Sequence, residues 1–496
     1  MASDIAKPAD LGSAPADAAP VHRRRGATIL FAGSTVAQAC ALARYTVLAR
    51  LLGPEQLGLA ATMVLTSQFF TSITDSGSDR FLIQDRDGDT PEVQKFVQLV
   101  WVTRGCVIAA ALMIFSGPIS LLFQAPAIAP GLIGLALASL IFGFVHLDMR
   151  RAQRRNDFST EGVATVIGEA LGLVATVVAA LTTRNFTAIL YGLVTRSAAI
   201  AVVSHLRAQR PYAIGFSRAH AARLAGFTGP LMVNGLLMFM AQQGDRIVVG
   251  NKLGVIQLGY YSAVLLLVFY PSAVLMGYLQ AIQLPRIAAT RDNADHRVAA
   301  ADGLAGQATL LAILQAAGFA IVGPVAITLL YGARYAQAPL VVCLIGVLQA
   351  SRFLRYWPTT MALGIGKSHI VLIGNVVRLA GLAAAVVGAI LSKSLISIAL
   401  GLTLGEMAAV TTALVMINLA ESRPVFSQLG RVAIFVLAMA TLGAWPLALA
   451  KPSLLPLIAL SAATAVVALT VWLREQRTIG EGLGAARRIL ATVTRS

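Results

Sequence analysis

The sequence is short of cysteine. Only Cys40, Cys106 and Cys343 occur in 496 residues, and all three lie in apolar segments. A disulfide framework needs paired cysteines, and structural zinc sites need closely spaced cysteine or histidine ligands. The six histidines are scattered and supply no such spacing. The sequence therefore predicts no disulfide framework and no metal site, and the cysteines are interpreted as small buried apolar residues.

Charged residues are also few. They make up 12% of the chain, whereas 57% of the residues are hydrophobic, and the mean hydropathy is +0.76. Soluble globular domains carry about 25% charged residues. This composition excludes an ordinary soluble protein and indicates a protein whose solvent is the lipid bilayer.

Catalytic and nucleotide-binding motifs are missing. Gly366, Lys367 and Ser368 form a Gly-Lys-Ser string, but the phosphate-binding loop also needs a glycine at the position of Met361. No His-Glu-x-x-His helix, nucleophile elbow or pair of close carboxylates occurs. The sequence predicts neither ATP binding nor a catalytic site, and therefore no enzyme.

Acidic residues are scarce relative to basic ones, with 22 against 39 and a formal net charge of +17. In a soluble protein this excess would suggest nucleic-acid binding. Here the basic residues lie at the edges of apolar segments, and no basic run with interleaved aromatic residues appears. We therefore exclude a nucleic-acid partner.

Long apolar runs dominate what is present. A membrane-spanning helix needs about 20 apolar residues, and runs of this length are too long for barrel strands. Fourteen such runs occur, at 27–50, 56–79, 94–116, 128–150, 160–182, 186–206, 225–248, 258–283, 302–330, 336–364, 368–391, 394–419, 428–449 and 453–474. The fold class predicted is an all-α polytopic membrane protein with about 14 transmembrane helices.

The basic residues orient these spans. With the N-terminus inside, 25 of the 39 lysines and arginines fall in loops and ends on that side, and only six fall on the other. Cytoplasmic loops retain lysine and arginine, so both termini are expected in the cytoplasm. A miscounted helix would invert every later loop and remove this asymmetry.

Two seven-residue segments nearly repeat each other. Residues 52–58 and 253–259 are identical at five of seven positions, at an offset of 201. Each joins two long apolar runs, which indicates two halves of similar design related by an axis along the membrane normal. The domains predicted are a disordered tail 1–25, an N-lobe 26–206, a cytoplasmic linker 207–224, a C-lobe 225–419, two appended helices within 428–474 and a basic amphipathic tail 475–496.

Charges at membrane depth are the residues most able to carry function. Each is costly against lipid, so each is expected to face protein or water. The cations are Arg44, Arg104, Arg196, Arg246, Arg352, Arg355 and Arg378, and the anions are Asp75, Glu169, Asp245 and Glu406. Seven cations against four anions leave positive charge that pairing inside the protein does not cancel. Guanidinium groups bind phosphate oxygens in a bidentate way, so this excess suits an anionic head group.

Arg352 and Arg355 are the strongest local signal. They are three residues apart in one span and share a helix face with Gln349 and Thr359. The alternatives to a substrate-binding role for these two arginines are snorkelling and structural pairing with Glu406 or Glu169. For Arg104 and Arg378 a ligand-facing position and a structural ion pair are equally good interpretations.

The seventh span carries Asn234, Gln242 and Asp245 on one stripe. A helix-to-helix hydrogen-bonding seam and a cavity wall are both compatible with this stripe. Arg44 and Asp245 occupy equivalent positions of the two repeats. If both approach the repeat axis they would pair as an outer gate.

Three segments resemble the bacterial polysaccharide transporter family: the first hairpin Leu48–Gly58, the second hairpin Asp245–Tyr261 and the string Gln283–Arg286. Members of this family are oligosaccharide-lipid flippases of the multidrug, oligosaccharidyl-lipid and polysaccharide exporter superfamily. The resemblance spans nearly the whole chain. It implies two six-helix lobes around a central cationic cavity, with two further helices appended.

The resemblance also implies a function. Family members move undecaprenyl-diphosphate-linked sugar units from the cytoplasmic to the periplasmic leaflet of the bacterial inner membrane, by alternating access. Membrane lipids, a polysaccharide polymerase and export machinery are the partners that this function suggests. The substrate-binding residues expected are Arg352, Arg355, Arg104, Arg378, Arg44, Arg246 and Gln349. The residues expected to act in gating or ion coupling are Asp245, Glu169, Glu406, Asn234 and Gln242. No cofactor is expected; coupling to H⁺ or Na⁺ fits such a protein, and no sequence feature selects the ion.

Two other functions stay in view. A cation-coupled exporter of drugs or other small molecules with the same fold should have an acidic, apolar cavity, which the arginine excess opposes. A membrane-embedded polymerase or ligase of lipid-linked glycans normally has a large outer loop with catalytic residues. The outer loops here are too short for that architecture.

Overall fold

The computed structural model describes residues 20–155, 157–289, 294–420, 426–450 and 454–476. Within these ranges every regular element is a helix. Predictions for residues 1–19 and 477–496, including most of the two tails, lie outside the described residues. The first helix begins at Pro20, inside the segment 1–25 that the sequence analysis assigned to a disordered tail.

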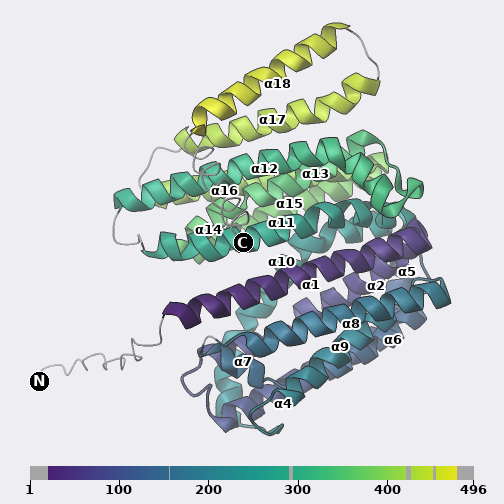
Figure 1. Cartoon of the computed structure of the whole chain (residues 1–496), viewed down its shortest axis with the longest axis vertical. Coiled ribbons are helices and arrows are strands. Elements are labelled where there is room, and N and C mark those ends of the chain that lie inside the picture. The colour runs from purple at the N-terminus through teal and green to yellow at the C-terminus, as the bar shows by residue number, and fades with distance from the viewer. Residues whose placement is uncertain (1–19, 156, 290–293, 421–425, 451–453, 477–496) are drawn as a thin grey trace, which may run out of the picture.

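The helices form two bundles, which lie one above the other in Figure 1. The first bundle contains α1 (Pro20–Leu52), α2 (Pro54–Ile73), α3 (Ser78–Gln84), α4 (Pro91–Ile114), α5 (Ser116–Leu122), α6 (Ile128–Gly143), α7 (Asp148–Gln153), α8 (Ser159–Thr183) and α9 (Ala188–Leu206). The second contains α10 (Arg218–Leu253), α11 (Val255–Ala289), α12 (Ala294–Tyr331), the short η1 (Ala333–Tyr335), α13 (Pro339–Leu354), α14 (Tyr356–Gly364), α15 (Ser368–Ser392) and α16 (Leu395–Ala420). We call them the N-bundle and the C-bundle.

Two further helices, α17 (Phe426–Ala450) and α18 (Leu454–Arg474), lie at the outer side of the C-bundle (Figure 1). Helix α17 packs on α12 and α13, and α18 packs on α17. No side chain of α18 is buried within the described chain. A helix that is apolar throughout and covered on one side only is suited to face lipid.

Among the described residues, ten helices are long and apolar enough to span a membrane, and up to twelve if two bent pairs count as single spans. The chain is therefore a multi-pass membrane protein. The two remaining predicted spans correspond to α1 and α6. Helix α6 is too short for the length criterion, with 16 residues, and the structure describes the side chains of only part of α1.

The bent spans have local causes. Helices α2 and α3 meet at 46°, where Gly77 adopts a left-handed conformation with φ 64°. Helix α10 bends by 45° between Arg218–Gly226 and Leu231–Leu253, and Pro230 lies in the gap. Proline lacks the backbone N–H that donates the helical hydrogen bond, so a kink at this point is expected.

The repeated hairpins of the sequence contact each other. Gly53 and Gly254 precede α2 and α11 with φ 87° in both cases. A Cβ added at Gly58 would overlap the carbonyl oxygen of Val255, and one added at Gly259 would overlap that of Pro54. This reciprocal contact is what a two-fold relation between the bundles requires. It confirms the duplication predicted from the sequence.

A second equivalence, between helices α8 and α15, was not predicted from the sequence. Helices α8 and α15 both have 25 residues and begin at serines 209 positions apart. Each ends at a basic residue in the left-handed conformation, Arg184 and Lys393, with φ 53° and 45°. The two-fold relation therefore extends from the hairpins to the far side of each bundle.

One apolar core joins the bundles near the hairpins. It includes Leu57 and Met63 of α2 together with Leu258 and Tyr261 of α11. A second core lies within the C-bundle, around Trp357 and Phe353. The bundles are thus held together at the hairpin end, and the polar cavities described below lie toward the opposite end.

Candidate functional site

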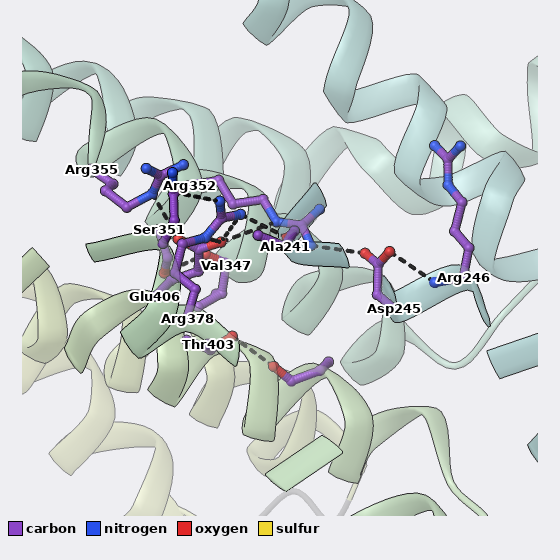
Figure 2. A network of polar contacts seen from close by, with 12 residues as sticks. Ala241, Asp245, Arg246, Val347, Ser351, Arg352, Arg355, Arg378, Thr403 and Glu406 are labelled. Carbon is purple, nitrogen blue, oxygen red and sulfur yellow. Dashed lines mark hydrogen bonds and ion pairs between the residues drawn. The ribbon is translucent and has the colours of Figure 1, made fainter. Parts of the chain in front are cut away.

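Glu406 of α16 is the centre of a buried polar network in the C-bundle (Figure 2). Its carboxylate accepts hydrogen bonds from Arg378 Nε of α15 at 2.9 Å and from Arg355 Nε at 3.0 Å. Arg352 Nε lies 3.5 Å from the same carboxylate. Arg355 is the residue at which α13 ends and α14 begins.

Arg352 also connects this network to α10. Its Nη2 donates to Asp245 Oδ2 at 2.8 Å, and the hydroxyl of Tyr261 donates to the same oxygen at 2.8 Å. Arg378 adds a bond from Nη2 to the carbonyl oxygen of Ala241 at 2.8 Å. Helices α10, α11, α13, α15 and α16 thus share one network, whose arginine side chains are 3–18% exposed.

The N-bundle has a smaller network of the same kind. Glu169 of α8 accepts hydrogen bonds from Arg44 of α1 and from Arg196 of α9. Glu169 and Arg378 are 209 positions apart, the offset that relates α8 to α15, and Arg196 and Glu406 lie within one residue of this offset on α9 and α16. The acid and the base are exchanged between the two bundles.

The predicted outer gate between Arg44 and Asp245 is wrong. Arg44 pairs with Glu169 of its own bundle, and Asp245 pairs with Arg352 of its own bundle. Both side chains are buried, with 4% and 1% of the residue exposed. Each charge finds a partner inside its bundle, so neither is left to bridge the axis.

The buried arginines are thus partly neutralised. Three arginines share Glu406 and Asp245, and two share Glu169, so each network retains more cations than carboxylates. The structural pairing weighed for Arg352, Arg355 and Arg378 is present, with Glu406 as the acid. A role of these arginines in substrate binding stays a prediction.

Arg104 of α4 lies outside both networks. It donates from Nη2 to the carbonyl oxygen of Thr71 at 2.7 Å and from Nε to the hydroxyl of Thr74 at 3.3 Å. Its guanidinium lies 5.4 Å from the ring centre of Trp101. In the part of the chain that the structure describes, no carboxylate lies within ion-pair distance of this guanidinium.

Arg104 lines a pocket of about 280 Å³ within the N-bundle. Its walls come from α2, α4, α6 and α9, and they carry hydroxyl groups and a second arginine. The polar lining residues are Ser67, Thr71, Trp101, Arg104, Ser139, Arg196 and Ser197. We call this cavity the N-bundle pocket.

A second polar cavity, of about 410 Å³, lies between α2 and α10. Asn234 and Gln242 line it, as the cavity-wall interpretation of their stripe predicted, whereas Asp245 does not. Asp75 and Arg80 also line it, with 3.9 Å between the nearest charged atoms. This interbundle pocket shares Ser67 and Thr71 with the N-bundle pocket, so the two cavities meet at α2.

The remaining predicted residues lie apart from these cavities. The Arg246 side chain points away from the C-bundle network (Figure 2), and its Nε has no hydrogen-bond partner among the described residues. Gln349 is 3% exposed, and its Oε1 likewise has none within the described chain. Their expected binding roles stay predictions.

Sequence reasoning missed several residues. Tyr261 has 0% exposure, and its hydroxyl donates a hydrogen bond to Asp245. Trp101, Ser67 and Thr71 are uncharged and had no motif to mark them. Their spacing to Arg104 and Arg196 becomes visible only when α2, α4 and α9 are packed. Among the described residues no cluster of histidine, cysteine and carboxylate side chains could hold a metal ion.

A family model described as polysaccharide biosynthesis protein matches residues 47–339. The succinoglycan biosynthesis transport protein ExoT of Rhizobium meliloti (strain 1021) is 27% identical over 301 residues, 59% of each chain. The chain thus spans about three fifths of the length of this curated relative.

Solved structures with the same fold are more distant in sequence. A lipid II flippase MurJ in an inward closed conformation has a TM-score of 0.65 at 14% identity, over 92% of this chain and 99% of that chain. A point mutant of the Vibrio cholerae MATE transporter VcmN has a TM-score of 0.57 at 14% identity, over 82% of this chain and 99% of that chain. These similarities establish the fold.

Proposed function

The chain belongs to the polysaccharide biosynthesis protein family, and we propose that it is a flippase for lipid-linked oligosaccharides. Its substrate in this proposal is an undecaprenyl-diphosphate-linked repeat unit, which it moves from the cytoplasmic to the periplasmic leaflet during surface polysaccharide synthesis. The name of the ExoT relative, a transport protein of succinoglycan biosynthesis, supports a polysaccharide precursor as cargo. The fold shared with MurJ supports a flippase rather than a channel.

One observation carries the proposal. Arg104 and Arg196 line a hydroxyl-rich pocket, and the buried networks hold more guanidinium groups than carboxylates. A bare diphosphate in hydrocarbon costs many kcal/mol, so it needs cationic partners along its route. Hydroxyl groups beside arginines suit a ligand in which sugars follow a phosphate.

The two ends of the molecule support the proposed direction of transport. The mutual contact of Gly58 and Gly259 closes the hairpin end. The interbundle pocket lies between α2 and α10, nearer the end with the arginine-rich loops. The positive-inside rule assigns that end, and both termini, to the cytoplasm of a bacterial inner membrane. This conformation would accept a substrate from the cytoplasmic leaflet.

Energy coupling is a further part of the proposal. Glu169, Glu406 and Asp245 each hold at least one arginine. Uptake of H⁺ by such a carboxylate would release its arginine, and an anionic head group would compete with the carboxylate for the same arginine. Either event loosens the contacts between helices of one bundle. A polysaccharide polymerase and export proteins are the partners that would receive the translocated unit.

A cation-coupled exporter of small molecules is the second candidate. The MATE-like fold favours it, as does Asp75, which lines the interbundle pocket. The arginines that line the adjoining pocket oppose it, because they would repel cationic drugs.

Deletion of the gene, followed by analysis of lipid-linked sugars and surface polysaccharide, tests the proposal. We expect lipid-linked repeat units to accumulate on the cytoplasmic side and the surface polysaccharide to disappear, with rescue by the wild-type chain. Normal polysaccharide without a trapped intermediate, in a strain with no second family member, would rule the proposal out. Drug sensitivity of the same strain would instead favour the exporter.

A further inference from the structure

An apolar groove runs between α4 of the N-bundle and α10 of the C-bundle. It has a volume of about 740 Å³, within the range of pockets that bind small ligands. Most of its lining surface is apolar and comes from residues such as Phe96, Leu99, Val107 and Leu224. Hydroxyl side chains also line it, at Thr74, Ser76, Thr103 and Thr228. Because its walls belong to different bundles, its width depends on how the bundles sit relative to each other.

Arg104 is the residue that this groove shares with the N-bundle pocket. On one side of its guanidinium lies the apolar groove, and on the other lies the pocket with Ser67, Thr71 and Arg196. The order along the protein is therefore apolar, cationic, then hydroxyl-rich. A polyisoprenyl-linked sugar has the same order, with a chain, a phosphate group and a carbohydrate.

The guanidinium of Arg104 has bonding capacity left. Of its five N–H donors, the described bonds use one on Nε and one on Nη2, both to uncharged oxygens of α2 and its C-terminal turn. Nη1 has no partner among the described residues. Phosphate oxygens would compete well for these donors, because they carry the opposite charge and can accept two parallel N–H bonds from one guanidinium.

We propose that the α4–α10 groove holds the polyisoprenyl chain of the substrate lipid, with its phosphate on Arg104 and its first sugar in the N-bundle pocket. The proposal rests on the function proposed above. It makes Arg104 the specificity residue for a charged carrier and the groove a lateral route from the bilayer. The groove residues of α10 lie in the half of that helix nearest the arginine-rich loops, and those of α4 run from Phe96 near that end to Val107 just past the middle. The substrate therefore enters from the leaflet on that side.

A larger side chain at Gly229 should block the groove. A Cβ built at Gly229 meets nothing within 4 Å, so a larger side chain can enter the space without displacing its neighbours. Gly226, one turn earlier on α10, also meets nothing within 4 Å, and it does not line the groove. Gly229→Leu and Gly226→Leu are therefore a matched pair.

The experiment uses the full chain in nanodiscs and a photoreactive undecaprenyl diphosphate. We expect cross-links on α4 and α10 peptides, and a loss of affinity of about tenfold in Arg104→Gln. Arg104→Lys should fall between Arg104→Gln and the wild type, because it keeps the charge and loses the planar fork. Gly229→Leu should weaken labelling to a similar extent, and Gly226→Leu should label like the wild type. Melting temperatures identify any variant that fails to fold.

Competition separates the lipid carrier from other occupants. Undecaprenol and inorganic pyrophosphate should each compete weakly, because each fills one half of the site. Equal competition by phosphatidylglycerol would mean that the groove takes any membrane lipid, which overturns the proposal. Wild-type labelling of both Gly229→Leu and a folded Arg104 variant would also overturn it.

The proposed binding site in the α4–α10 groove and the proposed flippase function can be tested independently. If deletion of the gene traps the lipid-linked intermediate but neither substitution alters labelling, the flippase stands and the groove is wrong. If the probe labels the groove as expected but deletion has no effect on polysaccharide, the binding site stands and the flippase function falls.

Discussion

Gly58 of α2 and Gly259 of α11 lie against each other across the axis that relates the two bundles. The Cβ that either lacks would lie within 3.1 Å of the other's backbone nitrogen and would overlap a carbonyl oxygen of the opposite hairpin. Small residues allow helix backbones to approach closely in membranes, where packing rather than hydrophobicity drives association. The hairpin end is therefore closed by backbone contact, without a salt bridge across the axis among the described residues.

Gly58→Ala should force α2 and α11 apart. Overpacking of this kind costs about 1–3 kcal/mol, and it should act on the closed state of the hairpin end. We expect a lower melting temperature and faster hydrogen exchange at residues 255–261. Gly277→Ala on α11 is the control, because a Cβ there meets nothing within 4 Å. Equal behaviour of the two variants would contradict the closure described.

Exchange of charges within the C-bundle should be partly tolerated. Glu406→Gln leaves three buried arginines with one carboxylate fewer, and breaking a buried pair typically costs about 3–5 kcal/mol. The double variant Arg378→Glu with Glu406→Arg restores the α15–α16 pair in the order found in the N-bundle. Thermal unfolding should show that the double variant is more stable than Arg378→Glu alone or Glu406→Arg alone. Rescue should be incomplete, because Arg378 also bonds to Ala241.

Asp245 and Arg352 should be energetically coupled. Arg352→Gln leaves the buried Asp245 carboxylate with the Tyr261 hydroxyl and the Arg246 backbone N–H as donors. Adding Asp245→Asn removes the uncompensated charge, so the double variant should lose less than the sum of the single changes. A double-mutant cycle from melting curves should give a coupling of about 0.5–3 kcal/mol. Additive effects would show that the 2.8 Å contact contributes nothing to stability.

Docking of the segment after α9 should weaken at mildly acidic pH. His146 is 2% exposed; its Nδ1 accepts from the Asp148 backbone N–H, and its Nε2 lies 3.0 Å from the Arg210 carbonyl oxygen. Burial and the neighbouring His205 lower the pKa of His146. The docked state thus favours the neutral ring, so its stability is complete above the ordinary pKa of about 6.5 and is lost as pH falls toward the lowered value.

Hydrogen exchange at residues 209–215, corrected for intrinsic rates, checks this at about pH 7.5 and 5.5, on either side of the ordinary histidine pKa. Burial opposes ionisation of Asp148, but hydrogen bonds from Arg151 and the Gln209 backbone outweigh it and lower the pKa of Asp148. This carboxylate therefore stays charged throughout the interval and does not account for a change. His146→Gln should abolish the pH dependence; if it persists in that variant, another group is responsible.

The sequence predicted the architecture more completely than the candidate site. The period of apolar runs and the repeat at 52–58 predicted a two-fold helical membrane protein, because both are local patterns that burial in lipid imposes. The equivalence of α8 and α15 was not predicted, because it appears only in the spacing of residues. The serines at which the two helices begin and the left-handed basic residues at which they end are separated by the same number of positions. Position within the apolar runs also singled out the charges that the two networks bury.

Partners of those charges could not be predicted. Arg44 and Asp245 are equivalent in the repeat, yet each pairs inside its own bundle, because Glu169 and Arg352 come within reach only when the helices pack. Trp101 and the serines of the N-bundle pocket have no sequence signature. A cavity formed by four helices depends on crossing angles, which no single segment encodes.

The exchange of acid and base between the bundles has a consequence for assembly in the membrane. Helices α8 and α15 are so alike that α8 could pack on α16, and α9 on α15, if apolar surface alone decided. Such mispairing would bring Glu169 against Glu406 and Arg196 against Arg378, like charges in a medium that screens them poorly. The reversed order of acid and base thus distinguishes correct from incorrect helix partners.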